Sequence, residues 1–186
     1  MLESINKVPN TNCIYIIDEN QNQNQNQCRN NCIKEALLKG SEIIGFVDDD
    51  DVGVFDCVDI ITEELKNNDV VYCNFKSNHF ESKYSGDVKK DLNRNIDPFV
   101  IFLTSKTATS LFEKYGEVFN EKVLSLDGEY LMFRLIIGNY KIKHIPNICY
   151  HRNKANPLDS VGYRNFNHTK GLMKMFNEKL NYKIFN

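Results

Sequence analysis

The chain has 186 residues, which favours one domain, because domains usually contain roughly 100–200 residues. Lysine and arginine total 23 against 25 aspartate and glutamate residues, so the formal net charge is -2. This balance argues against a protein that binds nucleic acid or an anionic membrane surface, because such proteins carry strongly basic surfaces. The sequence contains no apolar run long enough for a membrane span and no signal-peptide pattern at its start. We therefore expect a soluble, cytoplasmic protein.

The six cysteines give no pattern of metal binding. Most of them lie inside apolar runs, where a free cysteine behaves as a small hydrophobic residue. Cys28 and Cys32 are one helical turn apart, but no second pair completes a zinc site. We expect all of these thiols to be reduced.

The first half of the chain alternates between apolar strands and amphipathic helices. The pattern predicts strands over residues 13–17, 43–47 and 70–75, and helices over residues 28–39 and 56–66. A run of glutamine and asparagine over residues 21–27 is expected to be a solvated loop with no chemical role. This alternation predicts an α/β domain with a mostly parallel central sheet flanked by helices.

The second half of the chain continues the same pattern after a more polar stretch. Residues 76–95 are expected to form a hairpin or a mobile loop. The elements expected after it are a strand over 99–103, a helix over 107–115, a helix over 127–137, a strand over 140–150 with an edge or bend at Pro146, and a last amphipathic helix over 169–180.

Four consecutive aspartates follow the strand predicted over residues 43–47. Ligands bind parallel sheets beyond the carboxyl ends of the strands, so these acids are expected at a binding edge. Alternate side chains of an extended chain share a face, which makes Asp48 and Asp50 an Asp-x-Asp pair. Such a pair suits Mg²⁺ or Mn²⁺ with a substrate phosphate in the remaining positions. The alternative is a solvated acidic loop or a helix start.

Several stretches together resemble the GT-A-fold nucleotide-sugar glycosyltransferases, specifically the inverting enzymes of the family-two type. In chain order they are Ile16-Ile17-Asp18-Glu19, Arg29-Asn30-Asn31-Cys32-Ile33, Gly40 to Asp51, Ser125 to Leu135, Gly138 to Pro146, and Tyr150-His151-Arg152. The resemblance implies a GT-A (Rossmann-like) domain over residues 1–152 that lacks the family's usual first strand. Residues 153–186 would form a C-terminal loop and helix that pack on the same domain.

The resemblance also implies which residues bind the donor. Asp18 and Arg29 would contact the nucleotide, and Asp48 would face the ribose or the metal. Asp50 would be the direct ligand of Mn²⁺ or Mg²⁺ at the diphosphate. His151 would be an additional metal ligand or phosphate contact.

By the same resemblance, Asp127 would be the general base that takes the proton from the acceptor hydroxyl. Glu129 competes with Asp127 for this role, because Leu126 stands where the family often has an acid. An aspartate at the start of a helix can also serve only as an N-cap, and this alternative stays open.

The expected function is therefore metal-dependent, inverting transfer of a sugar from a nucleotide-diphosphate sugar, uridine-linked by resemblance. The acceptor would be a hydroxyl of a glycan, a protein or a small molecule. The alternative is a truncated, non-catalytic GT-A-like module that binds nucleotide or partners, for example within a homo-oligomer. A metal-dependent phosphoryl or nucleotidyl transferase could use the same acids. Neither a nucleic-acid partner nor a membrane span is expected.

Overall fold

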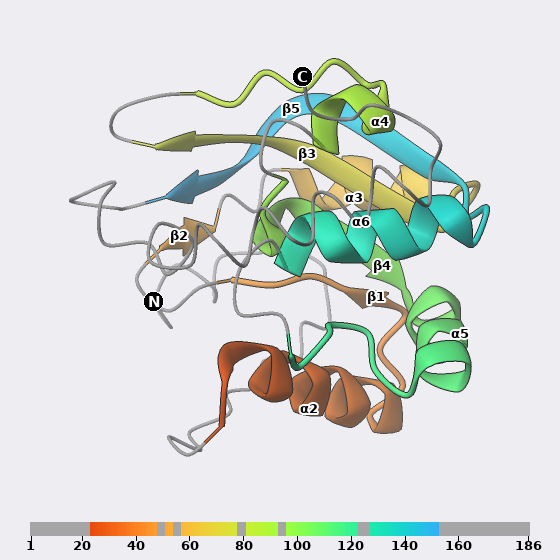
Figure 1. The fold of residues 1–186 in the computed structure, drawn as a ribbon. Coiled ribbons are helices and arrows are strands. Elements are labelled where there is room, and N and C mark those ends of the chain that lie inside the picture. Colours follow the sequence, from red (N-terminus) through yellow and green to blue (C-terminus); the bar gives the residue numbers. More distant parts are fainter. Residues whose placement is uncertain are drawn as a thin grey trace.

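The computed structural model describes residues 23–47, 51–53, 57–77, 81–92, 96–122 and 127–152 (Figure 1). Its strands are β1 (Ile43–Ile44), β2 (Val52–Gly53), β3 (Val70–Ser77), β4 (Ile101–Thr104) and β5 (Ile142–Arg152). Its helices are α2 (Gln25–Leu38), α3 (Val58–Leu65), α4 (Val88–Asp91), α5 (Ser105–Tyr115) and α6 (Asp127–Ile137), with the 3-10 helix η3 (Pro98–Val100). Among these helices, none is long and apolar enough to cross a membrane. The elements predicted over 13–17 and 169–180, and the C-terminal segment 153–186, lie outside the described residues.

The α/β class is confirmed, but the sheet is only partly parallel. The described strands form one sheet in the order β1-β4-β3-β5-β2. Strands β3 and β5 are parallel, whereas β4 is antiparallel to both β1 and β3, and β2 is antiparallel to β5. Strands β1, β3 and β5 therefore run in one direction, and their carboxyl ends lie on the same side, at the left in Figure 1.

Helices cover both faces of the central strand β3. In Figure 1, α6 lies in front of the sheet and α3 lies behind it. Every residue from Val70 to Phe75 is buried, so side chains on both faces of β3 contribute to the core. A strand buried on both faces loses the alternation of apolar and polar residues, which explains why Val70 to Cys73 is a continuous apolar run.

The strand predicted over residues 43–47 is shorter in the structure. Only Ile43 and Ile44 pair with β4, and Val47 is exposed. At Gly45 an added Cβ would lie 2.7 Å from the ring of Phe102, so a larger residue would collide with the neighbouring strand. The chain thus leaves the sheet before the acidic run begins.

Pro146 lies inside β5 at a bend, one of the two alternatives that the sequence predicted. The pairing of β5 with β3 shifts in register on both sides of Asn74, so the chain bends where Pro146 occurs. The Asn74 amide Nδ2 donates to the Pro146 carbonyl oxygen at 3.0 Å. The bulge removes Pro146 from the hydrogen-bonded ladder, which it could not join because proline has no N–H donor.

A buried carboxylate orders the described part of the polar stretch 76–95. Asp91, at the end of α4, is fully buried. Its carboxylate accepts hydrogen bonds from the Tyr72 hydroxyl at 2.7 Å, the Ser85 backbone N–H at 2.7 Å and the Gly86 backbone N–H at 3.0 Å. Gly86 has φ of 83°, a left-handed conformation that glycine adopts without steric cost. Residues 81–92 therefore contain a defined turn and a short helix.

Part of the glutamine and asparagine run is structural, contrary to the prediction of a solvated loop. Helix α2 begins at Gln25, inside the run. Asn24 caps the helix, because its side chain accepts from the backbone N–H groups of Asn26 and Gln27. The Gln27 side chain returns a hydrogen bond to the Asn24 backbone N–H at 2.9 Å, which completes a capping box.

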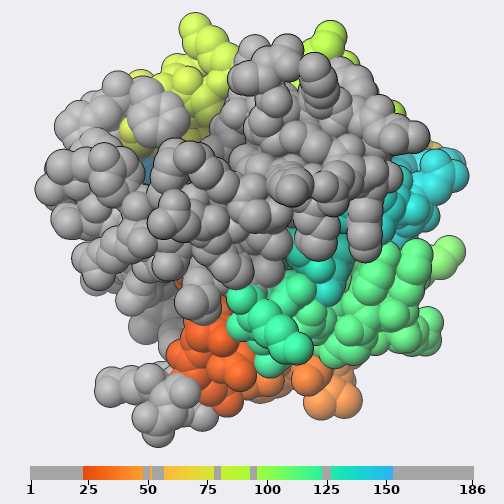
Figure 2. Space-filling view, viewed as in Figure 1, coloured from red at the N-terminus to blue at the C-terminus, as the bar shows by residue number. Residues whose placement is uncertain are grey.

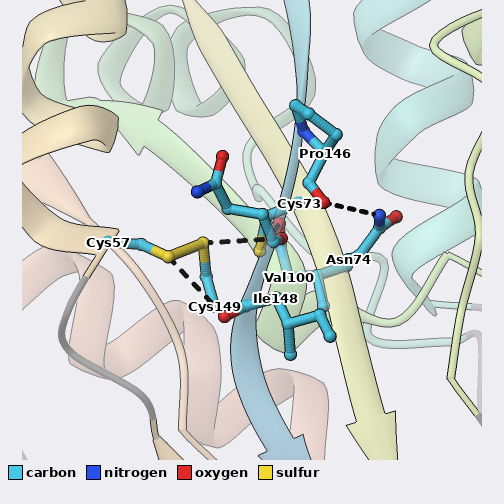
Figure 3. Close-up of a disulfide and its surroundings, with 8 residues drawn as sticks. Cys57, Cys73, Asn74, Val100, Pro146, Ile148 and Cys149 are labelled. Atoms are coloured by element: carbon cyan, nitrogen blue, oxygen red, sulfur yellow. Dashed lines mark hydrogen bonds between the residues drawn. A yellow bond between two sulfur atoms is a disulfide. The ribbon is translucent and has the colours of Figure 1, made fainter.

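A disulfide joins Cys57 at the start of α3 to Cys149 in β5, so the prediction of reduced thiols is wrong for this pair (Figure 3). Their Cα atoms are 5.5 Å apart, and 92 positions separate them in the sequence. Cys73 lies close by in β3 but is not part of the bond. Burial raises the pKa of the Cys73 thiol to about 12, so it does not supply the thiolate that disulfide exchange requires.

We predict that reduction of the Cys57–Cys149 bond lowers thermal stability. The cross-link restricts the unfolded chain over a long loop, so its loss should cost about 2–4 kcal/mol. For a chain of this size the melting temperature should fall by roughly 4–16 °C on addition of a reductant. The double variant Cys57→Ser/Cys149→Ser is the control, and its melting temperature should not respond to the reductant. A wild-type protein that is equally insensitive would contradict the prediction.

Candidate active site

An ion pair joins the amino-terminal ends of helices α2 and α6. The Arg29 guanidinium, in the second turn of α2, contacts the Asp127 carboxylate, in the first residue of α6. The Arg29 side chain is 10% exposed and the Asp127 side chain is 20% exposed. In Figure 1, both helices begin on the side where β1, β3 and β5 end. The pair therefore lies on the side where α/β proteins bind ligands.

Two further contacts fix the Arg29 side chain. Its Nη1 donates to the Asn26 side-chain oxygen at 3.2 Å. Its guanidinium also lies 5.4 Å from the centre of the Phe119 ring, within the range of a cation–π contact. Arg29 is thus held by a charge, an amide and an aromatic face together.

Three asparagines in and just after the polar run bind the backbone of residues 118–121, and we call them the asparagine ladder. The side-chain amides of Asn24, Asn26 and Asn30 donate to the carbonyl oxygens of Glu121, Asn120 and Phe119 at 3.0, 3.0 and 2.8 Å. Asn30, which is fully buried, also accepts from the backbone N–H groups of Val118 and Phe119 at 3.1 and 2.9 Å. Figure 2 shows α2 beside this green segment.

Helix α6 binds the same segment from its other side. Arg134 donates to the backbone oxygens of Glu117 and Val118 at 3.1 and 3.0 Å, and to the Glu117 carboxylate at 2.8 Å. Its guanidinium lies 4.6 Å from the Tyr115 ring centre and 4.7 Å from that of Tyr130. Residues 117–121 are therefore clamped between α2 and α6, shortly before Asp127.

Glu129 lies two residues after Asp127 but has a different environment. It is buried, and its Oε1 has no hydrogen-bond partner among the described residues. Burial raises the pKa of Glu129 well above its ordinary value, and the nearby carboxylate of Asp97 raises it further. Both effects favour the neutral, protonated form, because a second buried negative charge would be costly.

Gly128 allows α6 to approach the chain before η3 closely. An added Cβ at Gly128 would lie 1.9 Å from the Ile96 carbonyl oxygen and 2.9 Å from the Pro98 nitrogen. Any larger residue would push the first turn of α6 away from this backbone. The Asp127-Gly128-Glu129 sequence therefore places an acid on each side of a tight backbone contact.

An aromatic and charged cluster surrounds the end of β5. Arg152 contacts Asp97 at 3.4 Å and lies 5.2 Å from the Phe99 ring centre, and Phe99 stacks on Tyr150 at 4.1 Å. The Tyr150 hydroxyl donates to the Asp51 carboxylate at 3.0 Å. Asp51, the last of the four aspartates, is therefore buried and not part of a solvated loop.

The structure describes only some of the residues predicted to bind donor and metal. Asp18, Asp48 and Asp50 lie outside the described residues. His151 is exposed, and its backbone pairs with Val52 of β2. The described part of the chain contains no group of three or more His, Cys, Asp or Glu side chains that could hold a metal ion.

The fold can be compared with solved structures. A structure of Staphylococcus aureus TarS 1–349 in complex with UDP has a TM-score of 0.57 and 16% identity, over 82% of this chain and 44% of that one. TarS 1–349 in complex with UDP-GlcNAc has a TM-score of 0.58 and 16% identity, over 83% and 46%. TarS is a GT-A-type glycosyltransferase. This chain has the GT-A fold.

The likeness is one of fold alone, because the sequence identity is low. The chain spans less than half of TarS 1–349, and it covers 28% of a longer TarS structure, with a TM-score of 0.58 and 16% identity over 87% of this chain. No family model matches the sequence, and no curated protein matches it. The GT-A prediction is confirmed at the level of the fold.

Sequence reasoning singled out Arg29 and Asp127 but did not predict that they would contact each other. It missed the asparagine ladder and Asp97. The only sequence signal for the ladder is the recurrence of asparagine in and after a polar run, which is also the signal of a solvated loop. The partners of these amides are backbone groups about ninety positions away, so the local pattern does not indicate them.

We predict that Glu129→Gln flattens the pH dependence of stability. The folded protein holds the Glu129 proton more tightly than the unfolded chain, whose glutamate pKa is about 4.3. This contribution to the unfolding free energy is complete below pH ~4.3 and is lost as the pH rises toward the raised pKa of the folded state. The melting temperature of the variant relative to wild type should therefore be higher at pH 8 than at pH 5.

The control for this experiment is Glu113→Gln, a change at an exposed glutamate on α5. Its melting temperature relative to wild type should be the same at both pH values. An identical difference at pH 5 and pH 8 for Glu129→Gln would contradict a raised pKa at this position.

Proposed function

We propose that the chain transfers a sugar from a UDP-linked donor to an acceptor hydroxyl, with inversion at the anomeric carbon. The observation that carries the proposal is the Arg29–Asp127 pair, which lies beside the carboxyl ends of the strands of a GT-A fold. The TarS structures with this fold are complexes with UDP and with UDP-GlcNAc, which supports a uridine-linked donor.

Asp127 is the general base of the proposed reaction. As the acceptor oxygen attacks the anomeric carbon, its proton passes to the Asp127 carboxylate. The bond between the anomeric carbon and the diphosphate oxygen breaks, and its electron pair leaves with UDP. Asp127 is preferred to Glu129 because an ion pair with Arg29 requires an ionised carboxylate, whereas the raised pKa of Glu129 favours a protonated acid that has no free capacity for a proton.

The proposal includes Mn²⁺ or Mg²⁺, held by Asp48 and Asp50 with His151 as a further ligand. Strands β1 and β2 flank the aspartates in the sequence and are the two outer strands of the described sheet. The pairing of Val52 with His151 brings the His151 backbone next to the residue that follows the acidic run. Carboxylate oxygens suit Mg²⁺ and Mn²⁺. When bound, the cation would neutralise the charge that develops on the departing diphosphate.

We predict that UDP raises the melting temperature only when Mn²⁺ or Mg²⁺ is present, and that Asp50→Ala abolishes this effect. A ligand at 100 times its dissociation constant should add about 2.7 kcal/mol to the unfolding free energy. Thermal-shift titration with UDP, with and without Mn²⁺, measures the effect. The control is Asp59→Ala, a change at an exposed acid in the first turn of α3. If UDP raised the melting temperature equally with and without metal, the proposed role of the cation in UDP binding would be contradicted.

We predict that Asp127→Asn lowers sugar transfer by about 10²–10⁴-fold, the usual contribution of a general base. The UDP-induced thermal shift should stay close to that of wild type, because the change removes the proton acceptor and not the nucleotide contacts. Release of UDP from UDP-GlcNAc measures turnover, and Asp59→Asn is the matched control. If wild type binds UDP but releases none with any acceptor, the non-catalytic nucleotide-binding module is the better description.

A further inference from the structure

We propose that Arg29 is the positioning residue for the base: it holds the Asp127 carboxylate in the orientation that accepts the acceptor proton. This inference rests on the proposed function, and it gives Arg29 a role other than the nucleotide contact that the resemblance implies. The asparagine ladder contributes to this positioning, because it holds the backbone of residues 118–121, which lies between the two helices.

The first argument is that Arg29 is itself immobilised. Its side chain is 10% exposed, and Asn26 and Phe119 contact it from two further directions. Asn26 is in turn held by its bond to the Asn120 carbonyl oxygen. A guanidinium that can adopt so few other positions holds the carboxylate that it contacts in one orientation.

The second argument concerns the backbone that leads into α6. The ladder binds residues 118–121 from α2, and Arg134 binds Glu117 and Val118 from α6. Both groups of contacts are buried or half-buried, so water competes with them only weakly. The start of α6, and Asp127 with it, is therefore tied to α2 by more than the ion pair.

The third argument concerns the carboxylate itself. Arg29 contacts Asp127 through Oδ2. Within the described part of the chain no contact engages Oδ1, so this oxygen is the one left to receive a proton. A carboxylate that is held through one oxygen keeps its other oxygen oriented toward the acceptor hydroxyl. Arg29 thus acts through Asp127 and does not touch the reacting atoms.

The test compares Arg29→Ala and Arg29→Lys with wild type. The readouts are the kcat and KM of UDP release from UDP-GlcNAc, with water as the acceptor, and the UDP-induced thermal shift. For Arg29→Ala we expect kcat to fall by about 10–100-fold, as for a misplaced catalytic group, while KM and the UDP shift stay within about twofold of wild type. Arg29→Lys, which keeps the charge but loses the planar fork, should recover part of the kcat.

The matched control is Lys34→Ala, which removes another cation of α2 that contacts an aromatic ring, Phe112. A kcat for Arg29→Ala equal to that of Lys34→Ala would overturn the positioning role. Loss of the UDP shift with a raised KM would also overturn it, because Arg29 would then be a nucleotide contact. If Arg29→Ala does not fold, the same readouts on Arg29→Lys decide between these outcomes.

Failure of the inference is distinguishable from failure of the proposed function. A wild-type protein that releases UDP, with an Arg29→Ala variant of equal kcat, overturns only the role of Arg29. A wild-type protein that neither binds UDP nor releases it from UDP-GlcNAc overturns the proposed function and, with it, this inference.

Discussion

The arrangement of this site depends on the ion pair between Arg29 and Asp127. A charged group that is mostly removed from water is stable only with a partner, so each of these side chains requires the other. Their helices are far apart in the sequence, and the pair obliges α2 and α6 to begin at the same side of the sheet. The asparagine ladder and Arg134 support this constraint through neutral and charged hydrogen bonds to one short segment. A single salt bridge on a flexible loop would impose no comparable geometry.

The four aspartates after β1 are not equivalent. Asp51 is buried and its carboxylate accepts a hydrogen bond from the Tyr150 hydroxyl. The adjacent strand β2 pairs with β5. The disulfide then ties Cys57, a few residues further along, to Cys149 beside Tyr150. The end of the acidic run is therefore anchored to β5 by a hydrogen bond, a strand pairing and a covalent bond.

The helices with strong periodicity could be predicted from the sequence, and their ends could be predicted from glycine. Helix α5 ends before Gly116, whose φ of 77° is left-handed, and α6 ends before Gly138. The antiparallel direction of β4 could not be predicted, because a buried strand has the same apolar pattern in either direction. The Cys57–Cys149 disulfide could not be predicted for a similar reason. The pairing of cysteines does not follow from their spacing in the sequence, and cysteines in apolar runs resemble core residues.

The two acids at the start of α6 were left as competitors by the sequence, and their environments separate them. Asp127 lies partly exposed against a guanidinium, which stabilises a negative charge. Glu129 is buried and lies near the Asp97 carboxylate. Both its burial and this neighbouring charge raise the pKa of Glu129 and favour its neutral form. The burial of Glu129 therefore suits it to donate a hydrogen bond as a neutral acid, whereas the Asp127 carboxylate lies in contact with a cation. Gly128 makes this separation possible, since only a residue without a side chain lets the turn pack on Ile96 and carry Glu129 into the core.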